Sequence, residues 1–213
     1  MENIIEVKSL VKRFGKKTVL DGVTVEFEAH KIHGLIGRNG SGKTVLMKCI
    51  CGLTPITDGT VTVNGKRIGR DCEIIPNAGV IIETPGFLPN LSGYTNLKNL
   101  AALNGNIGKN DIRAAISQVG LNPDEKKHVG KYSLGMRQRL GLAQAIMENP
   151  DILILDEPMN GLDKEGVKDM RQYLLDLKSQ GKTILIASHS AEDIDVLCDT
   201  VCEMDKGILT AIR

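Results

Sequence analysis

A glycine-rich run limits the folds open to this chain: Gly37-Arg38-Asn39-Gly40-Ser41-Gly42-Lys43-Thr44, which fits the pattern G-x-x-x-x-G-K-[ST]. It lies between the apolar run ending at Ile36 and a helix-like segment that starts near Lys43. Glycines let backbone N–H groups turn inward around phosphate oxygens, and the following helix adds a positive dipole. The alternative is an ordinary glycine-rich turn, which the strand before and the helix after disfavour. The sequence therefore predicts a phosphate-binding loop, with Lys43 on the β- and γ-phosphates and the Thr44 hydroxyl on Mg²⁺.

Two adjacent carboxylates end a second informative run, Asp151-Ile152-Leu153-Ile154-Leu155-Asp156-Glu157-Pro158. Its apolar middle indicates a buried strand, and open α/β sheets bind ligands at the carboxyl ends of their strands. Asp156 can serve Mg²⁺, and Glu157 can orient or deprotonate a water molecule. The alternative is a solvated acidic turn. Downstream of a phosphate-binding loop, we favour the catalytic interpretation.

Hydrophobic periodicity predicts an α/β fold. Alternation over 23–27 and 61–63 indicates half-buried antiparallel strands near the N-terminus. Apolar runs without alternation indicate a parallel sheet covered on both faces, and they are 34–36, 79–82, 152–155 and 183–187. Helical stripes at 112–119 and 167–177 stop at Gly120 and Gly181, and Ser190 with Asp193 resembles a capping box. Residues from about 90 to 149 carry helical stripes and no convincing strand, so we expect a helical insertion between two core strands.

Length and charge restrict the organisation and the partners. A chain of 213 residues has room for one domain with a small satellite part. Lys and Arg number 27 against 26 Asp and Glu, so no strong positive field favours nucleic acid as a partner. Its apolar runs fall far short of the ~20 residues that span a bilayer. The chain ends at Arg213, soon after the last expected core strand, and we expect no C-terminal regulatory domain within it.

The cysteines indicate reduced thiols, because they are odd in number and no secretory signal precedes them. Cys198 and Cys202 are four residues apart and are expected to share one helix face toward the core. No further ligands at zinc spacing surround them, so a metal site there is disfavoured.

A third run, Tyr132-Ser133-Leu134-Gly135-Met136, lies upstream of the acidic pair. Ser133 is a good N-cap, and the helix it opens would present free N–H groups to an anion. A plain capped amphipathic helix explains the run equally well, so spacing alone leaves both interpretations open.

Taken together, the motifs resemble those of the ATP-binding subunits of ABC transporters. Ser133-Leu134-Gly135-Met136 is similar to a degenerate form of their L-S-G-G-Q signature, with Leu134 and Met136 where glycine and glutamine usually stand. Asn160-Gly161-Leu162-Asp163 resembles their D-loop, and Ser188-His189 resembles their H-loop. Motifs in this order run from about Ile4 to Gly207, nearly the whole chain.

The resemblance implies a P-loop NTPase core with a mostly parallel sheet, an N-terminal antiparallel β subdomain and an inserted helical subdomain, all within one ABC ATPase domain over residues 1–213. It implies ATP and Mg²⁺ as cofactors, with Glu157 as general base and His189 on the γ-phosphate. Residues implied to bind nucleotide are Phe14 under the adenine, Gly37, Arg38, Asn39, Gly40, Ser41, Gly42, Lys43, Thr44 and Val45. Thr44 and Asp156 are the implied metal ligands. Ser133 and Gly135 are implied to contact the ATP held by a second cassette.

One position departs from the family pattern. The strand before the helical insertion normally ends in a glutamine that touches Mg²⁺ and water, and here it ends in Glu83. Glutamate keeps an oxygen for Mg²⁺ but adds a negative charge near the γ-phosphate. The neighbouring segment 82–91, together with the signature run, resembles the branch that exports bacitracin and lantibiotic peptides or confers immunity to them.

The function implied is an ATPase subunit that works as a pair, on the cytoplasmic face of the membrane, and drives export of a peptide antibiotic or related amphiphile through separate permease subunits. The alternatives are a soluble, non-transport ABC ATPase and a nucleotide-dependent regulatory module. A soluble factor would need a second cassette or long coiled-coil arms, neither of which is evident here. A non-hydrolysing sensor would lack the carboxylate after Asp156, whereas Glu157 is present.

Overall fold

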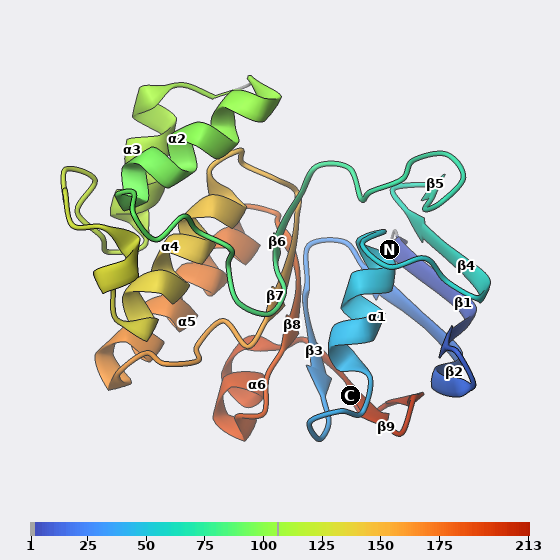
Figure 1. Ribbon diagram of the computed structural model, residues 1–213. Helices are drawn as coiled ribbons and strands as arrows, with labels where there is room; N and C mark the ends of the chain where they lie inside the picture. The colour runs from blue at the N-terminus through green and yellow to red at the C-terminus, as the bar shows by residue number, and fades with distance from the viewer. Residues whose placement is uncertain (1–2, 106) are drawn as a thin grey trace.

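A computed structural model describes residues 3–105 and 107–213, which form two β-sheets with helices packed around them (Figure 1). The N-terminal sheet has the strand order β2-β1-β4-β5, and the core sheet has the order β10-β9-β3-β8-β7-β6. The strands are β1 (Asn3–Phe14), β2 (Lys17–Glu28), β3 (Ile32–Ile36), β4 (Asp58–Val63), β5 (Lys66–Arg67), β6 (Ala78–Ile81), β7 (Ile152–Asp156), β8 (Thr183–Ala187), β9 (Thr200–Asp205) and β10 (Ile208–Ala211). The helices are α1 (Lys43–Ile50), α2 (Gly93–Asn104), α3 (Lys109–Gln118), the 3₁₀ turn Val129–Lys131, α4 (Leu134–Ile146), α5 (Lys164–Ser179) and α6 (Ala191–Leu197).

The core sheet is parallel except at one edge, as its uniform apolar runs predict. β3 pairs with β8 and β9, and β7 pairs with β6 and β8, all in parallel, whereas β10 pairs with β9 antiparallel. Along β7, Leu153 and Leu155 pack toward α4 and α5, and Ile152 and Ile154 pack toward α1 and the N-terminal sheet. Both faces are covered, so alternation disappears from the sequence.

Strand β6 is covered less completely than expected: Ile81 is buried on one face, whereas Ala78 and Val80 are partly buried on the other. Its burial alternates between partial and complete, and Ile82 lies beyond its end. The reason is its place at the edge of the core sheet, where β7 is its only neighbouring strand in the described part of the chain. A cleft of about 730 Å³ runs beside it and is lined in part by Leu100, Leu103 and Gln144.

The N-terminal sheet is antiparallel and half-buried, as the alternation predicts. Val23 and Phe27 of β2 and Val61 and Val63 of β4 face a core that they share with α1. This packing places α1 between the two sheets and fixes the helix that the glycine-rich run opens.

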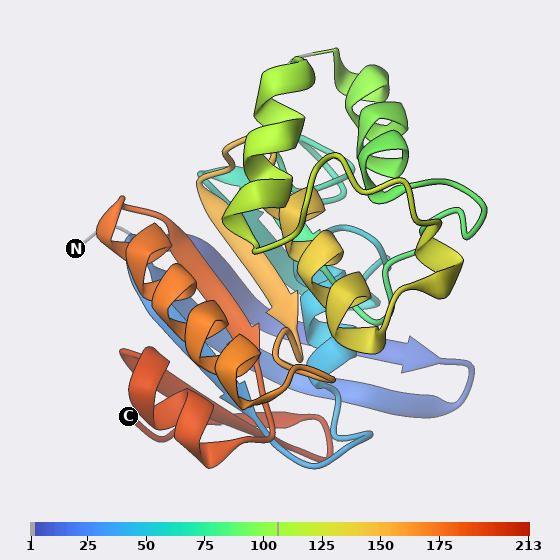
Figure 2. The same ribbon diagram turned by 90° about the vertical axis from the view of Figure 1, so that its left-hand side faces the viewer.

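The helical insertion is present. Between β6 and β7, the residues that the structure describes form helices α2, α3 and α4 and the 3₁₀ turn, and no strand. Helices α2 and α3 lie at the upper left of Figure 1 and the top of Figure 2, and α4 lies below them. Helix α3 ends just before Gly120 and α5 ends just before Gly181, whose φ angles of +75° and +86° suit glycine. Both helix ends therefore confirm the sequence prediction.

The prediction that Cys198 and Cys202 share a helix face is wrong. Cys198 caps the end of α6, and Cys202 lies in β9, because the helix stops after two turns and the chain enters the core sheet. Both thiols are buried, and burial raises the pKa of Cys198 to about 12. Within residues 3–105 and 107–213, no group of His, Cys, Asp and Glu side chains forms a metal-binding cluster, and no helix is long and apolar enough to cross a membrane.

A buried histidine in the core sheet is expected to make the free energy of unfolding depend on pH. His33 of β3 is 1% exposed, with Nδ1 2.7 Å from Thr200 Oγ1 and Nε2 2.8 Å from the Glu28 carbonyl oxygen. Burial lowers the pKa of His33, so below about pH 6.5 the unfolded chain takes up a proton that the folded chain refuses. We expect the free energy of unfolding to fall as the pH drops from about 6.5 toward the lower folded pKa.

Urea unfolding between pH 8 and pH 5 measures this effect. His33→Gln should flatten the dependence on pH, although the variant starts from a lower stability. His128→Gln removes an exposed histidine and should keep the wild-type slope. Equal slopes in all three proteins would show that His33 does not control the acid side of the stability curve.

Candidate functional site

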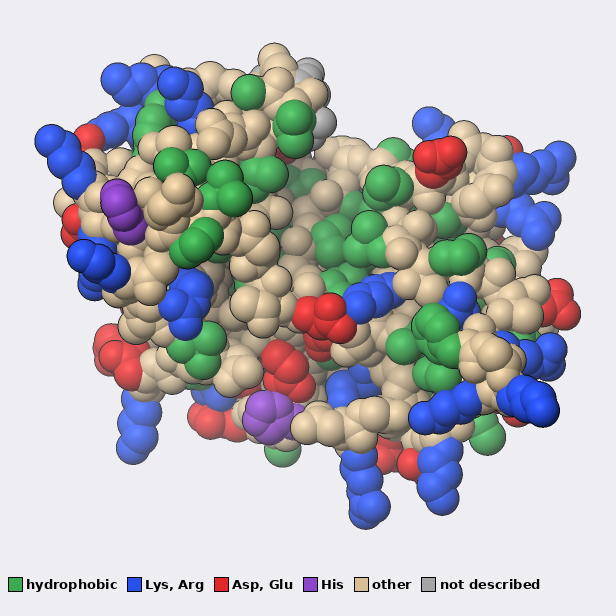
Figure 3. All heavy atoms as spheres, in the orientation of Figure 1, with side chains coloured by type: hydrophobic (Ala, Val, Ile, Leu, Met, Phe, Trp, Pro, Cys, Tyr) green, Lys and Arg blue, Asp and Glu red, His purple; other side chains and the backbone are tan. Residues whose placement is uncertain are grey.

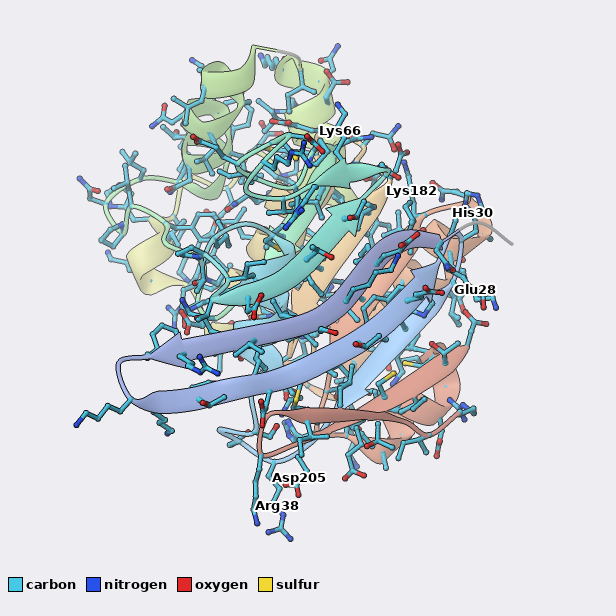
Figure 4. All side chains as sticks on the ribbon, turned by 90° about the vertical axis from the view of Figure 1, so that its right-hand side faces the viewer. Glu28, His30, Arg38, Lys66, Lys182 and Asp205 are labelled. Carbon is cyan, nitrogen blue, oxygen red and sulfur yellow. The ribbon has the colours of Figure 1, made fainter. Side chains whose placement is uncertain are left out.

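The predicted phosphate-binding and catalytic residues gather at the carboxyl ends of the central strands of the core sheet. β3, β7 and β8 run parallel, and at their carboxyl ends follow the glycine-rich loop, the Asp156-Glu157 pair and Ser188-His189. In Figure 4, Arg38 lies at the edge where β3 ends, and Lys182, just before β8, lies at the far end of the sheet. Acidic, basic and histidine side chains also meet in the lower middle of the face shown in Figure 3. The topology thus joins segments that are more than a hundred residues apart.

The loop between β3 and α1 surrounds the ammonium group of Lys43. The Lys43 Nζ atom donates to the Gly37 carbonyl at 2.6 Å and to the Arg38 carbonyl at 3.3 Å. Gly37 has φ +142°, and a Cβ atom there would lie 2.2 Å from the Met204 carbonyl oxygen, so only glycine fits. The loop is tied to the end of the core sheet by a hydrogen bond from Gly207 N to the Ser41 carbonyl at 2.9 Å.

This loop fits a polyphosphate. Within the described chain, the Ser41 hydroxyl is buried without a hydrogen-bond partner, which is costly unless a ligand or a loop rearrangement satisfies it. The first turn of α1 contributes free backbone N–H groups and a positive dipole to the same place. Arg38, Asn39 and Gly40 form the exposed tip, and Val45 is partly buried in the first turn of α1.

Thr44 and Asp156 meet beside the loop. The Thr44 hydroxyl donates to Asp156 Oδ2 at 2.7 Å, and Asp156 is 9% exposed at the end of β7. One hydroxyl and one carboxylate are too few to hold Mg²⁺ alone, but they suit an ion that takes its remaining ligands from phosphates and water. The donor set therefore fits magnesium bound together with a nucleotide.

Glu157 sits in a strained backbone conformation. Its φ angle is +50°, which is uncommon outside glycine, asparagine and aspartate. Three hydrogen bonds hold its backbone there. Its N–H donates to the Ala187 carbonyl at 2.9 Å, and its carbonyl accepts from Asn160 N at 3.1 Å and from Gln138 Nε2 of α4 at 3.2 Å. Backbone strain that several neighbours maintain is common at functional sites.

His189 is paired with Glu157. His189 Nδ1 lies 2.8 Å from Glu157 Oε2, and the histidine side chain is 72% exposed. With the proton on Nδ1, the ring donates to the carboxylate and leaves Nε2 directed elsewhere. Both side chains border a cleft of about 750 Å³, which has room for a ligand against them.

The capping box predicted at Ser190 and Asp193 is only half formed. Ser190 Oγ accepts from Asp193 N at 3.3 Å and caps α6. The return bond is missing, because the Asp193 carboxylate is taken by Arg171 and Ser188, and Ser190 N donates to Ser188 Oγ. The Asp193 carboxylate thus links α6 to Arg171 and Ser188 and does not cap the start of the helix.

Phe14 lies at the end of β1 and is 52% exposed, so it is not part of the core. The Lys12 ammonium lies 4.5 Å from the centre of its ring and donates to the Pro55 carbonyl at 2.7 Å. Lys12 is itself buried, so one face of the ring rests on a fixed cation. The exposed remainder of the ring is available to a flat ligand.

Ser133 and Gly135 do not join this group. Ser133 is the N-cap of α4, as predicted, and its Oγ accepts from Met136 N at 3.1 Å. A Cβ atom on Gly135 would lie 2.9 Å from the Gly161 carbonyl oxygen, so α4 packs closely on the turn before α5. In Figure 1 this end of α4 lies on the left, away from the loop between β3 and α1.

Glu83 lies two residues beyond β6. Its φ angle is +62°, and Oε1 forms an ion pair with Lys48 Nζ of α1 at 2.8 Å. The Glu83 side chain is 64% exposed. The carboxylate thus contacts the helix that follows the glycine-rich loop, one turn beyond Thr44.

Sequence reasoning missed the residues that support the site. Lys12 occupies an inward position of a strand, two residues before Phe14, and that unusual placement was a usable signal. Gln138, Arg171 and the second role of Asp193 had no local signal, because their partners lie far away in the sequence.

Comparison with known proteins decides the family. The ABC transporter family model matches residues 20–160. The chain belongs to the ABC transporter family. It is 46% identical to the protein named uncharacterized ABC transporter ATP-binding protein YybJ of Bacillus subtilis (strain 168), over 97% of this chain and 94% of the relative. It is 44% identical to the bacitracin transport ATP-binding protein BcrA of Enterococcus faecalis, over 98% of this chain and 68% of the relative.

A solved structure described as an ATP binding subunit of an ABC transporter superimposes with a TM-score of 0.86 at 25% identity, covering 98% of this chain and 90% of that one. The fold class and the family predicted from the motifs are therefore confirmed. This chain is an ABC ATPase, an ATP-binding and ATP-hydrolysing transporter subunit. Its relatives favour that function over a soluble, non-transport ABC ATPase and over a nucleotide-dependent regulatory module.

Proposed function

We propose that this ABC ATPase powers the export of a peptide antibiotic or a related amphiphile through separate transmembrane permease subunits. The observation that carries the catalytic part is the meeting of the Lys43 loop, Asp156-Glu157 and His189 at one sheet edge. The cargo is proposed from the bacitracin transport relative, which is similar over nearly the whole of this chain. The proposed working unit is a single ABC ATPase domain over residues 1–213, peripheral on the cytoplasmic face of the membrane.

In the proposed bound state, the ATP phosphates lie in the glycine-rich loop. Lys43 exchanges its two carbonyl contacts for the β- and γ-phosphates, and the loop N–H groups point at the remaining oxygens. The adenine stacks on the exposed face of Phe14. Thr44 and Asp156 would hold Mg²⁺, which when bound neutralises negative charge on the phosphates.

In the proposed hydrolytic step, Glu157 orients a water molecule and accepts its proton. The His189 ring, held by Glu157, contacts the γ-phosphate on its other side. The strained backbone of Glu157 keeps the carboxylate at the end of β7, which lowers the cost of ordering it during the reaction.

We further propose that ATP lies between two cassettes. Ser133 is exposed at the positive end of α4, so it suits contact with phosphates that another cassette binds. A second copy of this chain is the proposed partner. Glu83 and the segment 85–89 are proposed to contact the permease.

Reconstitution with a permease tests the proposal. The chain is expressed together with a candidate permease subunit, and the complex is placed in lipid vesicles. Bacitracin should raise the rate of phosphate release, and cells with the complex should tolerate more of the peptide. A chain that never co-purifies with the membrane protein, and whose ATPase rate ignores such peptides, would rule out the transport role.

Glu83 should tune Mg²⁺ dependence and coupling. Glu83→Gln preserves an oxygen and removes a charge, so we expect ATP binding to persist and the Mg²⁺ concentration for half-maximal rate to shift. The rate itself should change by less than about tenfold, well below the loss in Glu157→Gln, since general-base help remains. Glu83→Ala should mainly uncouple hydrolysis from transport.

Lys48→Met provides the matched control for Glu83, because it breaks the same ion pair and leaves the carboxylate in place. Wild-type Mg²⁺ dependence, turnover and peptide resistance in both Glu83 variants would instead indicate an exposed glutamate with no role in the site.

Phe14 should set the affinity for the base and not for the phosphates. Base stacking on an aromatic ring is worth about 1–3 kcal/mol, so Phe14→Ala should weaken ATP binding by about tenfold. Lys12→Met should weaken it less, in the same direction, because the ring loses the cation beneath it. Binding of inorganic tripolyphosphate, measured by calorimetry, should be unchanged in both.

Lys8→Met is the control for Lys12, since it removes an exposed lysine from the same strand. The stacking role of Phe14 is wrong if Phe14→Ala binds ATP as the wild type does, or loses ATP and tripolyphosphate affinity equally.

A further inference from the structure

The turn that carries His189 is held by a closed set of hydrogen bonds. Ser190 N donates to Ser188 Oγ at 3.1 Å, and the same hydroxyl donates to Asp193 Oδ2 at 3.1 Å. Asp193 N in turn donates to Ser190 Oγ at 3.3 Å. The residues on either side of His189 are thus both bound to Asp193, one through its carboxylate and one through its backbone.

The Asp193 carboxylate divides its two oxygens between two elements. Arg171 of α5 donates to Oδ1 from Nε at 2.8 Å and from Nη2 at 2.6 Å. Oδ2 remains for the Ser188 hydroxyl. Because the Ser188 hydroxyl donates its hydrogen bond to Oδ2, the Ser188 oxygen is left to accept from Ser190 N, and the direction of each bond is determined.

Burial makes this arrangement stiff. The Asp193 side chain is 5% exposed and the Arg171 side chain 15% exposed, whereas the neighbouring partner of Arg171, Glu192, is 75% exposed. A charge-assisted pair with little exposure is stronger than a surface ion pair and costly to break. The Glu192 contact is screened by solvent and contributes little.

The backbone of His189 needs this support because few contacts hold its side chain. The ring is 72% exposed beside the cleft of about 750 Å³, and its hydrogen bond to Glu157 is the side-chain contact that orients it. An exposed ring with a loose backbone would sample several positions. A misplacement of about 1 Å can cost a large factor in rate.

We propose that Asp193 and Arg171 are positioning residues, which hold the turn Ser188–Ser190 so that His189 meets Glu157 and the bound nucleotide in one orientation. Both residues are proposed to act through this turn and not on the reacting atoms. Arg171 lies about two turns into α5, whose N-cap is Asp163 in the D-loop-like segment, so the turn of His189 is anchored to that helix. The inference rests on the catalytic role proposed for His189 and Glu157.

The test compares variants that remove one bond of this set. Ser188→Ala removes the hydroxyl, Asp193→Asn removes the charge, and a third protein carries both changes. Asp124→Asn is the matched control, because it breaks a bidentate pair with Arg113 on the exposed surface of the helical part. Measurements are kcat and KM for ATP, thermal midpoint, and the ring ¹⁵N resonance of His189 in protein with labelled histidine.

We expect each single variant to lose about tenfold in kcat with KM within about twofold of wild type, since the phosphate loop is untouched. The double variant should lose little more than either single one, because both changes break the same chain of bonds. The His189 resonance should move while those of His30, His33 and His128 stay. Asp124→Asn should keep the wild-type rate and spectrum.

Folded single variants with wild-type kcat and an unmoved His189 resonance would overturn the proposal. So would losses that multiply to about 100-fold in the double variant, or a rise in KM equal to the fall in kcat. If Asp193→Asn does not fold, Arg171→Lys replaces it, because lysine keeps the charge and loses the paired donors. Arg171→Lys should show the same fall in kcat and the same movement of the His189 resonance. Wild-type values of both in Arg171→Lys would refute the positioning role. His189→Ala separates the two levels: full activity there refutes the catalytic role of His189, whereas loss of activity there with wild-type rates in Ser188→Ala refutes the positioning role alone.

Discussion

Replacement of Glu157 by glutamine should slow ATP hydrolysis by at least about 10²-fold and leave ATP binding intact. Glutamine has the shape of glutamate and can still accept the hydrogen bond from His189 through its amide oxygen, but it cannot take a proton from water. The backbone bonds that hold residue 157 do not involve the side chain and remain. Phosphate release under saturating ATP measures the rate, and equilibrium binding of labelled ATP measures the affinity.

Glu165→Gln provides the control, because it changes an exposed glutamate in the first turn of α5, close to the site in sequence and outside it in structure. It should hydrolyse ATP at the wild-type rate. Wild-type turnover in Glu157→Gln would assign the base to another group and remove the central step of the proposed mechanism.

A second large effect is expected at the signature run. Ser133→Arg should abolish ATPase activity without unfolding the chain, because it places a long cation where the ATP of the other cassette is proposed to dock. The lost N-cap costs only about 1 kcal/mol of stability. Ser92→Ala removes the corresponding cap from α2 and is the control for that loss; its rate should stay at the wild-type value.

Mixing two inactive proteins tests the shared site directly. Lys43→Ala should no longer bind ATP productively, since its own phosphate loop lacks the ammonium group, but it keeps Ser133. In an equal mixture with Ser133→Arg, about half of the dimers pair one of each, and each mixed dimer has one intact composite site. The mixture should regain up to about one quarter of the wild-type rate, and the wild-type rate per chain should rise with protein concentration. Failure to recover any activity, with association of the two variants demonstrated, would exclude sites shared between cassettes.

Much of the fold was predictable because its signals are local. The glycine-rich loop reveals itself through residues that only a tight turn around an anion requires, and the buried strands through unbroken apolar runs. The Ser133 cap and the glycine stops after α3 and α5 depend on a few adjacent residues, and each was found where the sequence predicts it.

Errors arose where the environment of a residue depends on distant partners. The run at β6 predicts a strand covered on both faces, yet one face is only partly buried, at the edge of the core sheet. The spacing of Cys198 and Cys202 suits a helix, but the chain leaves α6 between them to reach the core sheet. Asp193 matches a capping box, but the arginine that takes its carboxylate lies 22 residues earlier in the sequence.

The sequence by itself determined the family, the phosphate loop and the order of the motifs, since these depend on residue types within a few positions of one another. The tertiary structure decided which groups support them: Lys12 under Phe14, Gln138 on Glu157, and Arg171 with Asp193 behind His189. Gln138 and Arg171 reach partners on other elements, and Lys12, although it shares β1 with Phe14, is held beneath the ring by the Pro55 carbonyl. The energy of such contacts depends on packing that excludes water from them. Apart from the inward strand position of Lys12, the patterns within a few residues of these side chains do not indicate their partners.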